Sequence, residues 1–312
     1  MSRVDELLAG ARAGRIADIA RLVSIVENEE PEAADVVRAT YAHTGRAMLI
    51  GFTGPPGTGK STLVSALTAA YRKTAARVAV VAVDPSSPYT GGAILGDRIR
   101  MRDLYLDAGV FIRSMANRGN SGGLARATRR VVSLLDALGF DVVLVETVGV
   151  GQQEIDVVRV VDTVCLLTIP GAGDDIQAIK AGIMEIADVL VVNKADRPGA
   201  DQAVRDLTQM LTLGSPRLDW RTPVVKTSAM EGKGIDELID AIKKHRTWAE
   251  QSGEARKRNV EAMRSEVQTL LRDRVLRDMA ARLSSQRVDD VVLQVVDKTL
   301  DPYGAVDALL RE

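Results

Sequence analysis

Cysteine and histidine are scarce in this chain of 312 residues. It has one cysteine, Cys165 in the apolar run VCLLTIP, and two histidines, His43 and His245, which lie far apart in the sequence. A single cysteine excludes an internal disulfide and a thiolate metal cluster, and two histidines without ligand spacing give no metal site. We therefore expect a buried thiol at Cys165 and solvated side chains at His43 and His245.

An excess of charge and a long apolar run are also missing. The chain has 41 basic and 42 acidic residues, so its net charge of -1 favours neither nucleic acid nor an anionic membrane as a partner. No apolar run approaches the roughly 18 residues that cross a membrane. The N-terminal stretch MSRVDELLAGARAG has acids and arginines where a signal peptide is apolar. These patterns predict a cytoplasmic protein.

Three segments differ in their hydrophobic pattern. Residues 1–45 have apolar residues at helical spacing and predict an N-terminal helical arm. Residues 46–246 alternate short apolar runs with helical stretches, which is typical of a doubly wound α/β domain with a mainly parallel sheet. The expected strands are MLIGF, RVAVVAVD, VFIRS, VVLVET, VCLLTIP, VLVVNKAD and TPVVKTSA. Residues 247–312 predict a helical arm for self-association or partner binding, with packing back onto the core as the alternative.

The most specific motif is GPPGTGKS, which fits G-x-x-x-x-G-K-[ST] between an apolar run and a helical stretch. In such a loop, backbone N–H groups surround the β-phosphate, the lysine reaches the β- and γ-phosphates, and the serine hydroxyl binds Mg²⁺. The residues expected to bind nucleotide here are Gly54, Pro55, Pro56, Gly57, Thr58, Gly59, Lys60, Ser61 and Thr62.

Two later motifs select the base. The stretch NKAD, residues 193–196, follows an apolar run, and a carboxylate at its end can accept from both the N1–H and the N2–H₂ of guanine. Adenine lacks that pair of donors, so the motif predicts GTP and GDP. The stretch TSAM, residues 227–230, follows the last expected strand and offers backbone N–H groups to the guanine O6. The predicted guanine-site residues are Asn193, Lys194, Asp196, Ser228, Ala229 and Met230.

Acidic residues at strand ends predict a site for Mg²⁺ and the attacking water. Asp84 ends the run RVAVVAVD, and Asp97 in GDRIRM is a second candidate, with turn or helix-cap chemistry as the alternative for both. Glu146 follows the apolar run Val142 to Val145, where small GTPases place the aspartate of their DxxG motif, and Gly149 follows three residues later. The predicted catalytic residues are Lys60, Asp84, Glu146 and Gly149, and the predicted metal ligands are Ser61, Asp84, Asp97 and Glu146.

Two further groups are weaker candidates. Gln152 and Gln153 could position water, but contact with a partner is the favoured interpretation for these switch-loop residues. No arginine is marked as the one that stabilises the transition state. The candidates within the chain are Arg98, Arg100, Arg113 and Arg118.

Together, the phosphate loop, VDPSSPYTGGAILGDRIRM, ETVGVGQQE, PGAGDDIQAIKAGIMEIAD and NKAD resemble the methylmalonyl-CoA mutase-associated GTPases, the MeaB family once labelled arginine/ornithine transport kinases. The resemblance covers nearly the whole chain. It implies a homodimeric, GTP-hydrolysing assembly factor that gates adenosylcobalamin loading and protects or reactivates methylmalonyl-CoA mutase. It also implies that Asp84, Asp97 and Glu146 form the Mg²⁺ and water shell with Ser61, and that residues 171–185 communicate with the mutase.

Two other functions stay open at this point. A P-loop kinase linked to arginine/ornithine transport would use the same phosphate loop, but it has no need for the guanine selectivity of NKAD. A metal-insertion GTPase needs a transferable site of cysteines and histidines, which the chain hardly supplies.

Overall fold

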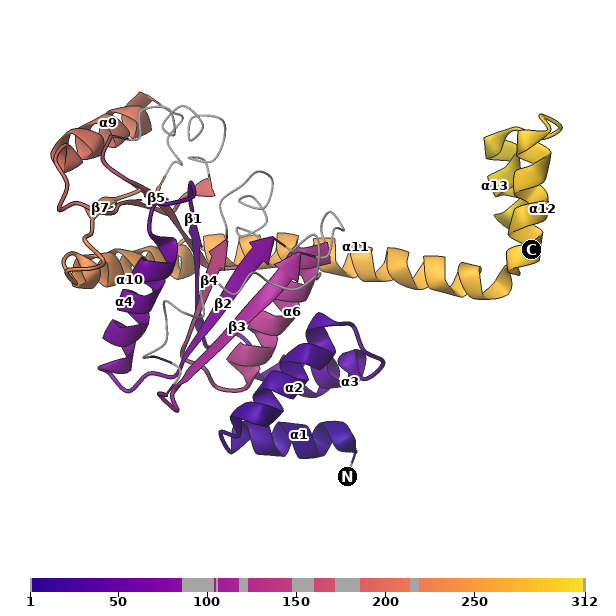
Figure 1. Ribbon diagram of the computed structural model, residues 1–312, viewed down its shortest axis with the longest axis horizontal. Helices are drawn as coiled ribbons and strands as arrows, with labels where there is room; N and C mark the ends of the chain where they lie inside the picture. The colour runs from indigo at the N-terminus through magenta and orange to yellow at the C-terminus, as the bar shows by residue number, and fades with distance from the viewer. Residues whose placement is uncertain are drawn as a thin grey trace. The chain divides into compact units, whose positions relative to one another are not determined.

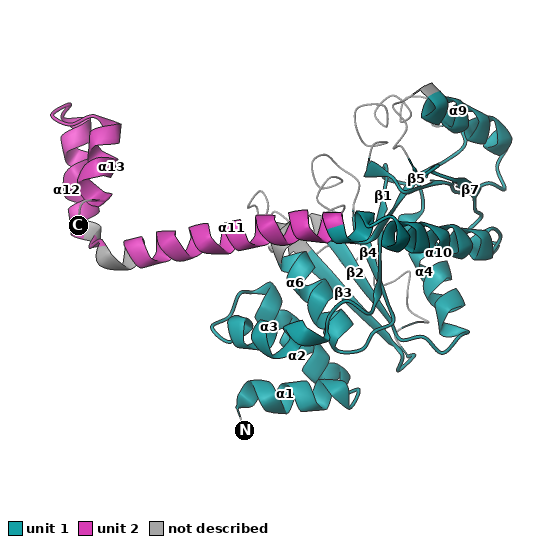
Figure 2. Cartoon of the chain, turned by 180° about the vertical axis from the view of Figure 1, so that it is seen from behind, with its two compact units in different colours: residues 1–256 teal, residues 257–312 magenta. Residues whose placement is uncertain are grey.

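The computed structural model describes residues 2–85, 104, 106–117, 123–147, 160–171, 186–213 and 219–310. The chain forms two compact units, residues 1–256 and residues 257–312 (Figure 2). The first unit contains the sheet and the nucleotide motifs, and the second is helical.

A parallel sheet of seven strands forms the centre of the first unit (Figure 1). Its strand order is β3-β2-β4-β1-β5-β6-β7, and all of these pairings are parallel. The strands are β1 (Met48–Thr53), β2 (Val78–Pro85), β3 (Val110–Asn117), β4 (Val142–Thr147), β5 (Thr163–Thr168), β6 (Val189–Val192) and β7 (Val224–Lys226). Each expected apolar run has become a strand, so the prediction of a doubly wound parallel sheet is confirmed.

Helices cover both faces of this sheet. One face packs against α4 and α10, and the other against α6 and the N-terminal helices, with α9 over β6 and β7. The helices of the first unit are α1 (Arg3–Arg12), α2 (Ile16–Glu27), α3 (Ala33–Thr40), the short 3-10 helix η1 (Tyr41–His43), α4 (Lys60–Arg72), α6 (Gly123–Ala137), α9 (Ala200–Leu213) and α10 (Ile235–Gln251). Because both faces are covered, all residues of β4, β5 and β6 are buried.

The expectation for the single cysteine is confirmed, and the expectation for the histidines is confirmed for only one of the two. Cys165 is fully buried in β5, as expected, and this burial raises the pKa of its thiol well above the usual value. The expectation of a solvated His245 is wrong, because its side chain is completely buried. Its Nδ1 lies 2.8 Å from the Thr163 hydroxyl and its Nε2 lies 3.3 Å from Asp188. His43, at the end of η1, is exposed as expected.

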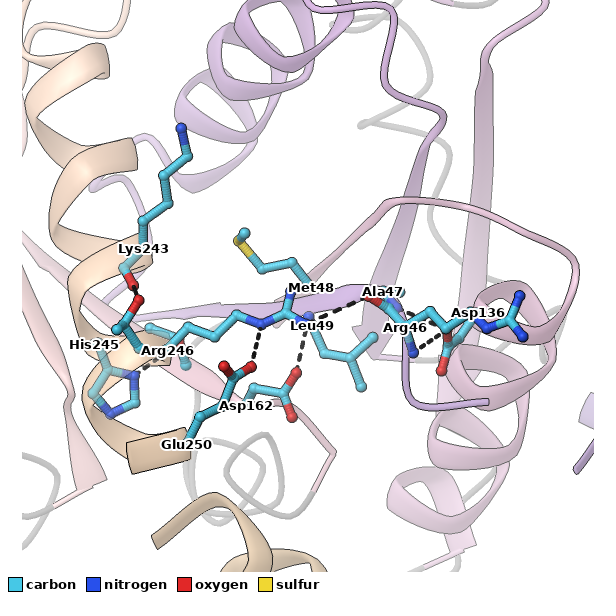
Figure 3. A network of polar contacts seen from close by, with 12 residues as sticks. Arg46, Ala47, Met48, Leu49, Asp136, Asp162, Lys243, His245, Arg246 and Glu250 are labelled. Carbon is cyan, nitrogen blue, oxygen red and sulfur yellow. Dashed lines mark hydrogen bonds and ion pairs between the residues drawn. The ribbon is translucent and has the colours of Figure 1, made fainter. Parts of the chain in front are cut away.

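Two aspartates accept hydrogen bonds from backbone N–H groups at the beginning of β1 (Figure 3). The buried Asp136 at the end of α6 accepts hydrogen bonds from the backbone N–H groups of Gly45, Arg46 and Ala47, just before β1. Asp162 accepts from Leu49 N–H at 3.2 Å. These carboxylates pair backbone donors that the strands leave unmatched at their beginnings.

The second unit consists mainly of helices, of which α11 is long. It contains most of α11 (Glu254–Arg282), together with α12 (Ser285–Val296) and α13 (Pro302–Leu310). Val291 of α12 is buried, whereas Val292 and Val296 on the same helix are more than half exposed. None of the helices in the described part of the chain is both long enough and apolar enough to cross a membrane.

Candidate functional site

The phosphate loop runs from the end of β1 to the beginning of α4 and depends on its glycines. Gly54 has φ 138°, and a Cβ atom there would lie 2.3 Å from the carbonyl oxygen of Leu167. Gly59 has φ 89° and precedes the first helical residue of α4, where a Cβ would lie 2.7 Å from Asn193 Nδ2. Both positions therefore exclude residues larger than glycine. The loop leads directly into α4, so the free backbone N–H groups at the beginning of this helix face the loop.

Lys60 is held inside this loop. Its side chain is buried, and its Nζ donates to the carbonyl oxygens of Gly54 at 2.7 Å and Pro55 at 3.1 Å. The ammonium group is thus placed beside the backbone that would surround the phosphates. A cation fixed there compensates negative charge on a bound polyphosphate.

Ser61 and Glu146 link the phosphate loop to the end of β4. The Ser61 hydroxyl donates to Glu146 Oε1 at 2.6 Å, and both side chains are almost fully buried. Strand β4 lies between β1 and β2, with Glu146 level with Phe52 of β1, so the carboxylate stands next to the strand that leads into the loop. Hydroxyl and carboxylate oxygens in contact at a phosphate loop form a donor set that suits Mg²⁺.

The other residues predicted around Glu146 are described only in part. Asp84 lies in β2, two residues beyond the position level with Glu146, and its side chain is outside the described part of the structure. Asp97 and Gly149 lie outside the described residues, as do the candidates Gln152, Gln153, Arg98, Arg100 and Arg118.

The remaining arginine candidate is engaged elsewhere. Arg113 in β3 forms an ion pair with Glu27 at the end of α2, and its Nε lies 2.9 Å from the carboxylate. A second nitrogen of the guanidinium lies 3.3 Å from the hydroxyl of Ser24, also in α2. Arg113 therefore fastens α2 to the sheet, and its suggested role beside the transferred phosphate is wrong for this arrangement.

Asn193 connects the base-binding motif to the phosphate loop. Its Nδ2 donates to Thr58 carbonyl oxygen at 2.8 Å, and its Oδ1 accepts from the Thr227 hydroxyl at 3.0 Å. Lys194, which adopts a φ of 55°, extends over the loop and donates to the Gly57 carbonyl at 2.6 Å. Three sequence motifs that are far apart along the chain are thereby held in one place.

Asp196 is oriented by the loop that follows β7. The Ser228 hydroxyl donates to Asp196 Oδ1 at 2.8 Å, and this hydrogen bond lowers the pKa of the carboxyl group below its ordinary value of 3.8. The nearby cations Arg197 and Lys233 act in the same direction. The carboxylate is therefore ionised at neutral pH and can accept the two guanine donors.

A cavity of about 870 Å³ brings these residues together. Its walls contain the predicted nucleotide residues except Gly54, Pro55 and Thr58, together with Glu146. The sequence prediction missed Arg197 and Glu231, which also line the cavity. They directly follow NKAD and TSAM, so their positions next to base-binding motifs are the only sequence signal that could have indicated them.

A parallel α/β sheet, a phosphate loop and a guanine-type NKAD motif in one cavity define a P-loop GTPase. The family profile described as Methylmalonyl Co-A mutase-associated GTPase MeaB matches residues 19–284. The chain belongs to this family, and it is a GTPase. The resemblance seen in the motifs is thus confirmed.

Individual relatives match most of the chain. A protein from Pyrococcus abyssi, named as a GTPase, is 47% identical over 312 residues, which cover 99% of this chain and 96% of the relative. The Methylmalonic aciduria type A homolog of Caenorhabditis elegans, a mitochondrial protein, is 32% identical over 292 residues, covering 88% and 73%. A crystal structure described as LAO/AO transport system kinase, 29% identical, matches with a TM-score of 0.73 over 100% of this chain and 98% of its own.

Proposed function

We propose that this GTPase uses Lys60, Ser61 and Glu146 as the described part of its hydrolytic site, with Asp84 and Gly149 completing it. The observation that carries this assignment is the contact between Ser61 and Glu146 inside the cavity, beside the phosphate loop. GTP hydrolysis depends on positioning and charge compensation more than on covalent chemistry. The loop N–H groups and Lys60 would hold the β- and γ-phosphates, while Asn193 and Asp196 hold the base.

Mg²⁺ fits the same residues. Oxygen donors are what this ion prefers, and the Ser61 hydroxyl and Glu146 carboxylate supply them at the first turn of α4 and the end of β4. We propose Ser61, Glu146, Asp84 and Asp97 as the metal and water shell. When bound, the ion would compensate charge on the β- and γ-phosphates.

We further propose that nucleotide turnover serves a cobalamin enzyme. The chain would gate the loading of adenosylcobalamin into methylmalonyl-CoA mutase and protect or reactivate that enzyme. Two findings support this role: the family is described as mutase-associated, and the relative from C. elegans is named for methylmalonic aciduria. We also propose a cytoplasmic location and a homodimer, for which exposed apolar residues on α11 and α12 offer a surface.

Cofactor transfer in a purified system tests the mutase role. Apo-mutase, adenosylcobalamin and the chain are mixed with GTP, GDP or a non-hydrolysable GTP analogue, and holo-mutase is followed by its cobalamin absorbance. We expect loading and GTP turnover to depend on each other. The Lys60→Ala variant should lose the nucleotide dependence. Identical loading with every nucleotide and with the variant would contradict the proposal.

The alternative function is a kinase linked to arginine/ornithine transport. It is supported by the solved structure that is 29% identical to this chain, because that protein is described as a transport system kinase. The two functions differ in where the γ-phosphate goes. Incubation with γ-labelled GTP and membrane or periplasmic transport proteins separates them. Label released only as inorganic phosphate supports the GTPase role, and label retained on a protein supports the kinase.

The proposed division of labour follows the three segments of the sequence. We assign nucleotide chemistry to residues 46–246, and dimerisation and partner contacts to the C-terminal arm 247–312. The N-terminal arm is joined to the rest of the first unit by ion pairs such as Glu27 with Arg113 in β3 and Glu29 with Arg130 in α6.

A further inference from the structure

Met230 is an exposed apolar side chain at the wall of the nucleotide cavity. It is 91% exposed, whereas Met115 in the core is 1% exposed. Such exposure leaves the Met230 thioether accessible to a dissolved oxidant. The residue lies in the loop between β7 and α10 that also carries Ser228.

The loop holds Met230 in place through its backbone. Ser228 N–H donates to the Lys233 carbonyl at 3.0 Å and Lys233 N–H donates back to the Ser228 carbonyl at 3.2 Å, which closes residues 228–233 into a tight turn. Gly234 follows with φ 74°, and a Cβ there would lie 2.0 Å from the Lys226 carbonyl oxygen. Ala229 N–H contacts Asn193 Oδ1 at 3.4 Å. The backbone of Met230 is therefore fixed beside the base-binding residues, at the wall of the cavity.

We propose that Met230 is a site of reversible oxidation that lowers the affinity of the GTPase for guanine nucleotides. This inference rests on the proposed guanine site. A methionine thioether is soft and polarisable and makes favourable contacts with aromatic rings, which suits a residue beside a purine base. Its sulfoxide is polar and chiral and loses that contact.

The oxidant is a hydroperoxide, for which hydrogen peroxide serves as the probe. The sulfur donates an electron pair to one peroxide oxygen, an S–O bond forms, and the O–O bond breaks. The second oxygen leaves as water with both peroxide hydrogens, so sulfur is oxidised by two electrons and the peroxide is reduced by two. Methionine sulfoxide reductases reverse the modification.

The test uses the full-length protein, with and without GDP, exposed to graded hydrogen peroxide. Peptide mass spectrometry quantifies sulfoxide at each methionine, and displacement of a fluorescent GDP analogue gives the Kd. We expect Met230 to oxidise about tenfold or more faster than buried Met115, because access governs the reaction. GDP should slow the oxidation of Met230. Oxidised protein should bind GDP about two- to tenfold more weakly, as expected for loss of one sulfur–aromatic contact.

Two variants isolate the effect. The Kd of Met230→Leu for GDP should be the same before and after peroxide treatment, whatever its starting value. Met263→Leu, which changes a residue of α11 outside the cavity, should lose affinity for GDP on oxidation as the parent does. Treatment with methionine sulfoxide reductase should restore parental affinity. If untreated protein does not bind GDP, the nucleotide site itself is wrong. If GDP binds normally but Met230 oxidises no faster than Met115, or Met230→Leu loses as much affinity as the parent, the oxidation site is wrong.

Discussion

At the scale of single residues, Glu146 combines burial with a short hydrogen bond to the Ser61 hydroxyl. The Glu146→Gln substitution keeps the shape of the side chain but removes its charge from the metal and water shell. We expect kcat for GTP hydrolysis to fall about 10²-fold, the cost of removing one preorganised electrostatic group. GDP affinity measured without Mg²⁺ should change little, because the loop N–H groups and Asp196 hold the nucleotide. Phosphate release and GDP titration give the two quantities.

Glu146→Asp provides the matched control, since it keeps the charge and shortens the reach by one methylene. It should retain more activity than Glu146→Gln when Mg²⁺ is raised. Equal loss in the two variants would show that shape rather than charge matters at this position. If Glu146→Gln hydrolyses GTP at the full rate, the Glu146 carboxylate has no role in hydrolysis.

The Ser228 hydroxyl bound to Asp196 gives a prediction about pH. This hydrogen bond lowers the pKa of Asp196, so the carboxylate remains ionised until the pH falls through that lowered pKa, and guanine binding is lost only there. Ser228→Ala should raise the pKa toward the ordinary value and move the acid limb of GDP binding to higher pH. Titrations of GDP affinity between neutral and acid pH measure this limb. An unchanged limb would show that the hydrogen bond from the Asp196 backbone and the cations Arg197 and Lys233 suffice to keep the carboxylate ionised.

Single residues also show what the sequence could and could not provide. Lys60, Ser61 and Asp196 were identifiable because phosphate and guanine chemistry demands particular residue types at fixed spacings. His245 was misjudged because its neighbours in sequence are polar, whereas its environment comes from Thr163 and Asp188, which are distant along the chain. The local sequence pattern shows only which residues are neighbours along the chain. The burial of a side chain depends on tertiary contacts with distant residues.

At the scale of secondary structure elements, Asp136 joins the end of α6 to the segment that enters β1. Asp136→Ala would leave the buried N–H groups around Ala47 without their acceptor, so we expect a loss of about 2–4 kcal/mol in unfolding free energy. Urea denaturation measures it. Asp35→Ala is the control, because its ion pair with Arg38 has side chains 63% and 78% exposed and should contribute little. Similar midpoints for the two variants would contradict this role.

Elements differ in how well the sequence predicted them. The strands were recognisable because a parallel sheet covered on both faces needs continuous apolar runs, as in β4 with all its residues buried. The helices α1 and α2 were also expected from their periodicity. Their packing partner was not, because an apolar stripe shows that a helix is covered without showing by what. Helix α2 packs against α6 and β3, and the ion pair of Glu27 with Arg113 links it to β3.

At the scale of the whole molecule, the residues of the nucleotide cavity all belong to the first unit, and the exposed apolar residues of α11 belong to the second. A chain ending at Gly253 would stop at a glycine with φ 78°, just before α11 begins. We expect this truncated protein to fold, to bind GDP within about twofold of the full chain, and to be monomeric. Calorimetry and light scattering measure affinity and mass.

A full-length variant separates the loss of the helix from the loss of its apolar surface. Val267 and Leu271 are 62% and 64% exposed and lie four residues apart, so they share one side of α11. Replacing both with lysine keeps the length and charges that side, which should prevent self-association while leaving GDP affinity as in the parent. If this variant still forms dimers, the dimer interface does not include this side of α11. A truncated protein that folds but fails to bind GDP would show that the second unit contributes to the nucleotide site, contrary to the composition of the cavity.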